Sequence, residues 1–225
     1  AEIIIGNKNK SKITKYIKEY ERTHERIIEF YDMSEVDFED MEIKKYEHHH
    51  RAFIKIEDGC NNFCSYCIIP YVRGRVRSKE FNKVQDLALS GHKEIVLSGI
   101  HTGQYNSDNK RLADLINEIS KIDEIKRIRL SSVEIVELDE KMMDIIKNND
   151  KFVSHLHIPL QAGSDHILKL MNRRYDKEYF MNKVKEIRSL RKDISLSTDV
   201  IVGFPGETEE DFNETMEFCK EIGFS

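Results

Sequence analysis

The chain has 225 residues, of which 39% are hydrophobic and 34% charged, and its formal net charge is −5 at pH 7. This length can bury a substantial core, and the periodic blocks of Ile, Leu, Val and Phe exclude a disordered chain. The net negative charge argues against a generally basic surface for nucleic acid, so any such binding must be local.

No apolar run approaches the roughly 18 residues that a membrane helix requires, and no signal peptide is visible. The four cysteines are too few for a disulfide scaffold, and three of them fall within residues 60–67. This grouping predicts metal chemistry in a reducing, cytoplasmic compartment without membrane association.

Residues 1–45 are predicted to be the C-terminal tail of a small α/β domain, followed by a linker. A strand at Ile3–Ile5 precedes a helix whose apolar positions follow helical spacing: Ile13, Tyr16, Ile17 and Tyr20. Residues 32–50 are acidic and then His-rich, as in a linker. Because the chain starts without Met and stops just after a helical pattern, we expect a fragment of a longer protein.

Residues 46–225 are predicted to form an α/β domain in which strands alternate with helices. Five apolar strands are expected, at Ala52–Ile56, Glu94–Leu97, Ile128–Leu130, His155–Leu160 and Leu196–Val202. This alternation indicates βαβ units with a parallel sheet, and five units fit an incomplete (β/α) barrel better than a doubly wound sheet. In such barrels the chemistry collects at the C-terminal ends of the strands.

Three apolar stripes at helical spacing lie between or after these strands. Their members are Leu112, Leu115, Ile116, Ile119 and Ile122, then Phe180, Val184 and Ile187, and then Phe212, Met216, Cys219 and Ile222. In the third stripe we expect Cys219 to be a buried, inert thiol. The acidic residues between 207 and 217 are expected to supply helix N-terminal charge and a solvent-exposed face.

Cys60, Cys64 and Cys67 follow the first expected barrel strand with the spacing C-x3-C-x2-C. Three thiolates on a short loop can hold three irons of a 4Fe-4S cluster and leave the fourth iron open to an external ligand. Two alternatives stay open. One is a structural zinc site that takes a further ligand from His48, His49 or His50, and the other is three unconnected core cysteines.

The segment Gly59–Cys67, with an aromatic residue before the third cysteine, resembles the radical S-adenosylmethionine (SAM) superfamily. The resemblance implies that the open iron binds the amino and carboxylate groups of SAM. An electron donor protein then allows SAM to be cleaved to a 5′-deoxyadenosyl radical. It also implies that Tyr66 packs beside the adenine, the alternative being a loop aromatic that anchors the cluster to the core.

Five longer segments resemble the radical SAM methylthiotransferases, which add a methylthio group to a tRNA base or a ribosomal protein. These segments are Cys67–Ser78, Leu97–Tyr105, Arg129–Glu134, His157–Ser164 and Thr198–Thr208. Gly99–Gly103 and Ser131–Glu134 are similar to the branch that acts on threonylcarbamoyladenosine in tRNA. The isopentenyladenosine branch more often carries Gly-Gln-Asn-Val-Asn in the segment that corresponds to Gly99–Gly103. The ribosomal-protein branch differs from this chain in both segments. The resemblance implies a tRNA methylthiotransferase for N6-threonylcarbamoyladenosine at position 37.

The same resemblance assigns further residues to the cofactor: Ser98, Gly99, Glu134, Gln161, Val202 and Gly203. It implies that the Ser98-Gly99 backbone lines the methionine amino group and that the Val202-Gly203 backbone lies beside the adenine. Gln161 would bind ribose hydroxyls or a carboxylate, and Glu134 would accept a hydrogen bond from SAM or orient a cation. The alternatives are turn glycines and strand-end caps.

Arg73, Arg75, Arg77 and Lys79 place four positive charges beside the cysteines. A guanidinium there can pair with the cofactor carboxylate or with an RNA phosphate, and a solvated surface is the alternative.

Complete methylthiotransferases, by the same resemblance, add three N-terminal cysteines that hold a second 4Fe-4S cluster and a small C-terminal RNA-binding barrel. Neither is found in these 225 residues, so we expect weak tRNA binding. Two other functions stay open. One is a coproporphyrinogen-oxidase-like radical SAM enzyme, because Val202–Thr208 also fits that family, and the other is a zinc-stabilised RNA-binding module. The sequence does not fix the sulfur donor, the electron donor or the oligomeric state.

Overall fold

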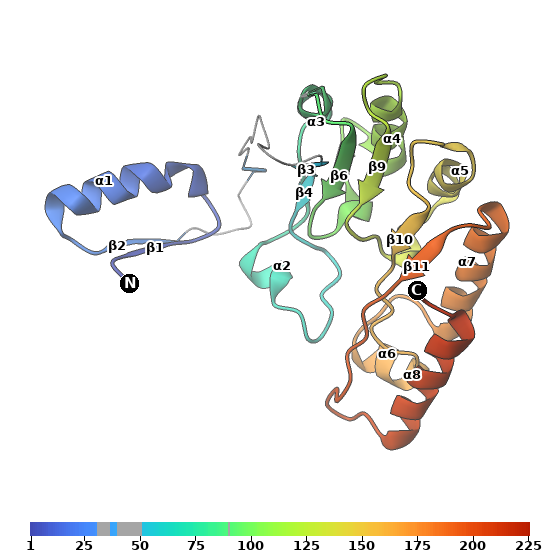
Figure 1. Ribbon diagram of the computed structural model, residues 1–225. Coiled ribbons are helices and arrows are strands. Elements are labelled where there is room, and N and C mark those ends of the chain that lie inside the picture. The colour runs from blue at the N-terminus through green and yellow to red at the C-terminus, as the bar shows by residue number, and fades with distance from the viewer. Residues whose placement is uncertain (31–36, 40–50, 90) are drawn as a thin grey trace.

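The computed structural model describes residues 1–30, 37–39, 51–89 and 91–225 (Figure 1). In the first of these ranges, β1 (Ile3–Ile5) pairs in parallel with β2 (Ile27–Glu29), and α1 (Ile13–Thr23) connects them after a short 3-10 helix, Lys10–Lys12. The expected strand and helix are confirmed. The expected apolar face of α1 is wrong in part, because only Tyr16 is buried while Ile13 and Ile17 are 39% and 43% exposed.

The predicted boundary between residues 45 and 46 and the histidines at 48–50 lie outside the described residues. The division into 1–45 and 46–225 stays a prediction.

The larger part of the chain is built on parallel strands, as the sequence predicts. β3 (Arg51–Lys55), β6 (Glu94–Ser98) and β9 (Arg127–Leu130) form one sheet in that order, and β10 (His155–His157) pairs with β11 (Ser195–Ser197). A parallel bridge between Ile128 and Phe152 connects β9 to the chain just before β10. These strands and the helices that flank them form part of a (β/α) barrel.

The last two strands end earlier than expected because side chains interrupt their backbone ladder, which resumes at a parallel bridge between Gln161 and Val200. The Tyr175 hydroxyl donates to the carbonyls of Pro159 and Leu160, and Thr198 Oγ1 donates to Ile158 O while accepting from Leu160 N–H. Gln161 then adopts φ +69°, which turns the chain out of the strand direction.

The helices alternate with the strands along the chain; those up to residue 148 flank the strands, and those at 165–170 and 209–222 lie below β10 and β11 in the view of Figure 1. They are α3 (Phe81–Ala88), α4 (Leu112–Ser120), α5 (Glu140–Asn148), α6 (Asp165–Leu170), α7 (Lys177–Leu190) and α8 (Glu209–Ile222). Ile54, Leu97 and Leu130 point from their strands into the core under these helices. Shorter elements join the strands and helices: β4 (Glu57–Asp58), α2 (Ile69–Val72), β5 (Arg77–Ser78), β7 (Asn106–Ser107), β8 (Lys110–Arg111) and the 3-10 turns Thr102–Gln104 and Ile135–Glu137. Across the ranges that the structure covers, we find no helix with the length and apolar character of a membrane span.

The buried face of α8 differs from the apolar stripe expected at Phe212, Met216 and Cys219. Its buried residues are Asp211, Thr215, Phe218 and Ile222. Two of them are polar, because Asp211 accepts from Ser164 Oγ and Thr215 Oγ1 accepts from Gly163 N–H. Phe212 is 38% exposed and Met216 43%. Cys219 packs against the core but is only partly buried, and its burial raises the pKa of its thiol.

Two phenylalanines that the sequence placed in apolar stripes are expected to differ in their contribution to stability. Phe180 is fully buried and its ring contacts Tyr175, Phe218 and Phe224. We expect Phe180→Ala to lower the free energy of unfolding by about 3–5 kcal/mol, and Phe212→Ala by less than about 1 kcal/mol. Urea denaturation measures both. Equal losses would contradict the burial of the two side chains.

Candidate functional site

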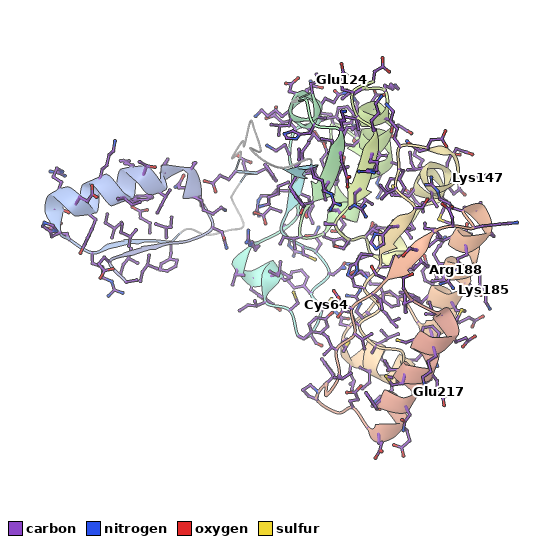
Figure 2. The ribbon with its side chains drawn as sticks, in the orientation of Figure 1. Cys64, Glu124, Lys147, Lys185, Arg188 and Glu217 are labelled. Carbon is purple, nitrogen blue, oxygen red and sulfur yellow. The ribbon has the colours of Figure 1, made fainter. Side chains whose placement is uncertain are left out.

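The three cysteines lie on a loop that begins directly after β4. Antiparallel pairing of β4 with β5 closes the loop at its base, where Glu57 faces Ser78 and Asp58 faces Arg77. Gly59 adopts φ +87°, and Cys60 N–H donates to Gly74 O across the loop at 3.2 Å. Figure 2 shows Cys64 on this loop, below the strands in that view.

The far side of the loop is held by the connection between α6 and α7. Ser65 donates through its N–H to Met171 O and through its hydroxyl to Leu170 O, and Asn172 Nδ2 donates to Phe63 O. Phe63 itself has φ +49°. The loop therefore has one shape set by contacts on both sides.

Gly59 is expected to be essential to this shape. A Cβ atom at Gly59 would lie 2.1 Å from the backbone oxygen of Arg75, whereas Gly91, which has the same φ of +87°, has no atom within 4 Å of such a Cβ. Gly91→Ala should cost only the left-handed backbone penalty of about 1–2 kcal/mol. Gly59→Ala adds a backbone clash and should destabilise the protein by clearly more. Urea denaturation of the two variants measures the difference, and equal costs would contradict the close approach of Gly59 to Arg75.

A pocket of about 230 Å³ opens beside the loop at the C-terminal ends of the strands. Its walls bring together six of the residues predicted from the sequence: Cys60, Cys64, Cys67, Tyr66, Glu134 and Gln161. The remaining lining residues are Asn62, Ile69, Ile100, His101, Thr102, Ser132, Val133, Pro159 and Arg173. Tyr66 is 40% exposed and meets Phe204 edge to face, and burial of its hydroxyl raises its pKa.

Four predicted cofactor residues are not among those that line this pocket. Gly99 packs against Glu57, where a Cβ would lie 2.8 Å from the carboxylate oxygen Oε2, so Glu57 gives a structural reason for a glycine. Val202 is exposed, and the N–H of Gly203 is hydrogen-bonded to Glu207. Ser98 ends β6. Roles of these four residues in SAM binding stay predictions.

Arg173 is a pocket residue that the sequence reasoning missed. Its side chain is 3% exposed; it pairs with Glu134 and donates to Cys64 Sγ at 3.2 Å and to the Tyr175 hydroxyl at 3.2 Å. Burial would lower its pKa, but the hydrogen bond to Glu134 outweighs burial and raises it, so Arg173 stays cationic. No sequence pattern signals this residue, because its partners lie far away in the chain.

His101 is a second buried pocket residue with a defined environment. Its Nδ1 lies 3.4 Å from Cys60 Sγ, its Nε2 lies 3.4 Å from Glu137 Oε1, and its backbone N–H donates to Glu57 Oε2 at 2.6 Å. Burial lowers the pKa of the imidazole, but the interactions with Cys60 and Glu137 outweigh it and raise the pKa to about 9. The interaction with His101 lowers the pKa of Glu137.

Glu57 is expected to make stability depend on pH. Burial raises its pKa from 4.5 to about 7, against the opposing effect of the His101 N–H. As the pH rises from 4.5 to 7, the unfolded chain ionises at this residue while the folded chain stays protonated. Folding stability should therefore fall by up to about 3 kcal/mol over this range. Urea denaturation of the metal-free protein at several pH values measures the fall. Glu57→Gln, which keeps an acceptor for the His101 N–H, should reduce it, and an unchanged profile would contradict the assignment.

The basic run beside the cysteines is held mainly by one buried carboxylate. Asp58 pairs with Lys55 at 2.7 Å, Arg73 at 3.3 Å and Arg77 at 3.5 Å. Burial alone would raise the pKa of Asp58, but these three cations lower it. Two members of the run thus have a structural partner.

Arg75 is the member of the run that faces solvent. Its guanidinium lies 4.7 Å from the centre of the Phe63 ring, and Phe63 meets the 73% exposed Tyr71 edge to face at 5.7 Å. Lys79, in contrast, is buried. The predicted contact with RNA or a carboxylate is therefore geometrically most accessible at Arg75.

The chemistry of the cysteine loop fits an iron–sulfur cluster. Each cysteine of such a cluster binds a different iron, so its sulfurs are spread more widely than the ligands of a single ion. Cys60, Cys64 and Cys67 all line the pocket, so their thiols face one space beside the loop. The zinc alternative that uses residues 48–50 lies outside the described residues.

Three comparisons with known proteins give the family. Residues 54–219 match the model of the radical SAM superfamily. Threonylcarbamoyladenosine tRNA methylthiotransferase MtaB from Bacillus subtilis (strain 168) is 39% identical over 100% of this chain and 51% of its own length. The tRNA-2-methylthio-N(6)-dimethylallyladenosine synthase from Clostridium tetani (strain Massachusetts / E88) is 40% identical over 99% of this chain and 51% of its own length. The chain thus spans about half the length of these curated relatives.

Among solved structures, the radical SAM methyltransferase TsrM from Kitasatospora setae matches with a TM-score of 0.61 and 18% identity. The match covers 76% of this chain and 34% of TsrM, and it confirms the predicted partial barrel. Since the matched family model covers most of the chain, this protein belongs to the radical SAM superfamily.

Proposed function

We propose that the protein containing these residues is a tRNA methylthiotransferase that acts on N6-threonylcarbamoyladenosine at position 37 of tRNA. The observation that carries the proposal is a single pocket at the strand ends that combines three thiols with a buried Arg173–Glu134 pair. The relatives supply the reaction type, because both carry the names of tRNA-methylthiolating enzymes.

In this proposal Cys60, Cys64 and Cys67 hold a 4Fe-4S cluster, and SAM binds beside it. The cluster and SAM would supply radical chemistry. The methionine end of SAM carries an ammonium and a carboxylate, and the pocket offers Glu134 and Arg173, whose charges complement them. A guanidinium can bind a carboxylate through two parallel hydrogen bonds, which fixes its orientation. Gln161 and Tyr66 also line the pocket, within reach of the rest of the cofactor.

The rim of the pocket supports an RNA substrate. Beside the cysteine loop, Tyr71 presents an exposed aromatic ring, and Arg75 adds a positive charge over the ring of Phe63. Unstacked bases of an RNA loop bind to such aromatic faces, each worth about 1–3 kcal/mol. The anticodon loop presents unstacked bases of this kind.

The choice of nucleoside rests on two segments that resemble the threonylcarbamoyladenosine branch. Both segments contribute to the pocket, the first through Ile100, His101 and Thr102 and the second through Ser132, Val133 and Glu134. Relatives named for the two nucleosides match at nearly equal identity. Overall identity therefore favours neither branch, and the isopentenyladenosine nucleoside is the second candidate.

The intact protein is proposed to carry a second 4Fe-4S cluster and to receive electrons from a donor protein. For the present 225 residues we expect tRNA binding no tighter than the non-specific range of about 10⁻⁴ to 10⁻⁶ M, because few cations face solvent near the pocket.

The test is nucleoside analysis of tRNA from a strain that lacks the gene. We expect loss of the methylthio form of threonylcarbamoyladenosine and retention of the parent nucleoside. Re-expression of the intact gene should restore the methylthio form, and the same gene with Cys60→Ala should not. Loss of methylthio-isopentenyladenosine instead would assign the protein to the other branch, and an unchanged tRNA would refute the tRNA activity.

A further inference from the structure

His101 lines the pocket and also contacts Cys60, one of the three cysteines proposed to hold the cluster. His101 is 4% exposed, and its Nδ1 lies 3.4 Å from Cys60 Sγ. A thiolate that binds metal offers only lone pairs to a neighbour, so Nδ1 must carry the hydrogen in this contact.

The position of His101 is held from three directions. The Glu57 carboxylate accepts its backbone N–H at 2.6 Å, and Glu137 lies 3.4 Å from its Nε2. The following turn packs closely on Glu137, since a Cβ atom at Gly103 would lie 2.5 Å from the Glu137 Cβ. The backbone of His101 is hydrogen-bonded, and its Nε2 faces the Glu137 carboxylate as an ion-pair partner without hydrogen-bond geometry; together these contacts orient the ring toward the sulfur.

We propose that His101, oriented by Glu137, is a positioning residue that raises the reduction potential of the cluster by donating a hydrogen bond to the Cys60 sulfur. Reduction adds negative charge to a cluster and its thiolates. A donor at the sulfur stabilises this charge, and hydrogen bonds to the sulfurs are among the factors that set cluster potentials. Electron entry thereby becomes easier.

The hydrogen-bond donor to the Cys64 sulfur differs from the donor to the Cys60 sulfur in its second partner. The donor to Cys64 is Arg173, at 3.2 Å, which also faces Glu134 in the proposed SAM site. His101 instead has Glu137 as its second partner. Because His101 also lines the pocket, the potential is measured without SAM, so that a substitution at His101 reports on the hydrogen bond to sulfur and not on cofactor binding.

The inference rests on the proposed cluster at Cys60, Cys64 and Cys67, and the experiment separates the two. Each protein is reconstituted without oxygen, its iron and sulfide are measured, and its midpoint potential is determined by redox titration followed by absorbance and electron paramagnetic resonance. In His101→Leu we expect the ratio of reduced to oxidised cluster at a fixed potential to fall at least tenfold, which corresponds to about 59 mV for one electron. His101→Asn keeps an N–H donor close to the position of Nδ1 but not the charge of a protonated imidazole, so it should recover part of the lost potential and lie above His101→Leu.

Glu137→Gln provides a second measurement that leaves both His101 and Cys60 in place. It weakens the contact that orients the imidazole, so we expect a smaller decrease of the midpoint potential than in His101→Leu. If His101→Leu does not retain iron, Glu137→Gln replaces it as the test. A parent protein that binds no cluster would refute the proposed site. The inference would be overturned if His101→Leu held a full cluster with an unchanged potential. If His101→Leu does not retain iron, an unchanged potential in Glu137→Gln with a full cluster would overturn it instead.

Discussion

Replacement of Cys64 by Ala is expected to abolish reductive cleavage of SAM. In the proposed cluster, Cys64 is one of only three protein ligands, and its loss leaves an iron without a thiolate. The fall in 5′-deoxyadenosine formation should exceed the roughly 10- to 100-fold effect typical of groups that only support a metal ligand. Chromatography of reactions run with a strong reductant measures the product.

Cys219→Ala is the matched control for this experiment. Cys219 is a partly buried thiol on α8 and is not among the residues that line the pocket. It should keep both the iron content and the cleavage rate of the parent protein. Cleavage that persists in Cys64→Ala, or disappears in Cys219→Ala, would show that the assignment of the cysteines is wrong.

Replacement of Arg173 by Met is expected to affect both stability and cofactor affinity. Glu134 is 17% exposed and would lose its cationic partner; because the pair is part-buried, the cost should lie below that of breaking a fully buried ion pair, which is about 3–5 kcal/mol. Urea denaturation measures the stability, and calorimetric titration of the reconstituted protein with SAM measures the affinity. Arg174→Met is the control, because Arg174 is exposed and donates to the backbone oxygen of Asn61 at 3.3 Å.

A double variant separates the two effects of Arg173. Arg173→Met combined with Glu134→Gln removes the unpaired charge, so it should recover part of the lost stability. It should not recover SAM affinity, because both groups that complement the methionine end are gone. Recovery of affinity along with stability would show that the pair only supports the fold.

The strands could be predicted from the sequence because each contains or adjoins short apolar segments that alternate with helical patterns, although of the five expected strands only β6 is a continuously buried run. The predicted strand ends and the predicted buried face of α8 were wrong where polar side chains form hydrogen bonds in place of backbone pairing or apolar packing. Tyr175 and Thr198 shorten β10 and β11 by capturing backbone groups that a longer strand would pair. Asp211 and Thr215 occupy the buried face of α8 because partners from the Gly163-Ser164 turn satisfy them.

In the candidate site, residues that are close in the sequence could be predicted, and residues brought together by distant contacts could not. The cysteines could be found from their spacing, since three donors on one loop are neighbours in any fold. Arg173 and His101 acquire their environment only when distant segments meet. Arg173 reaches Cys64 from a position 109 residues later, and His101 reaches Cys60 across 41 residues. A single sequence carries no spacing rule for such pairs.

The pairing of β4 with β5, in which Asp58 faces Arg77, affects how the cysteine loop binds iron. Asp58 and Arg77 already join the two ends of the loop through protein contacts alone. The entropic cost of closing the loop is thus met when the chain folds, and metal binding does not have to provide it. A zinc finger, by contrast, folds only when its metal binds. Here the pairing of β4 with β5 and the contact between Asp58 and Arg77 join the ends of the loop, so loop closure does not depend on the metal alone.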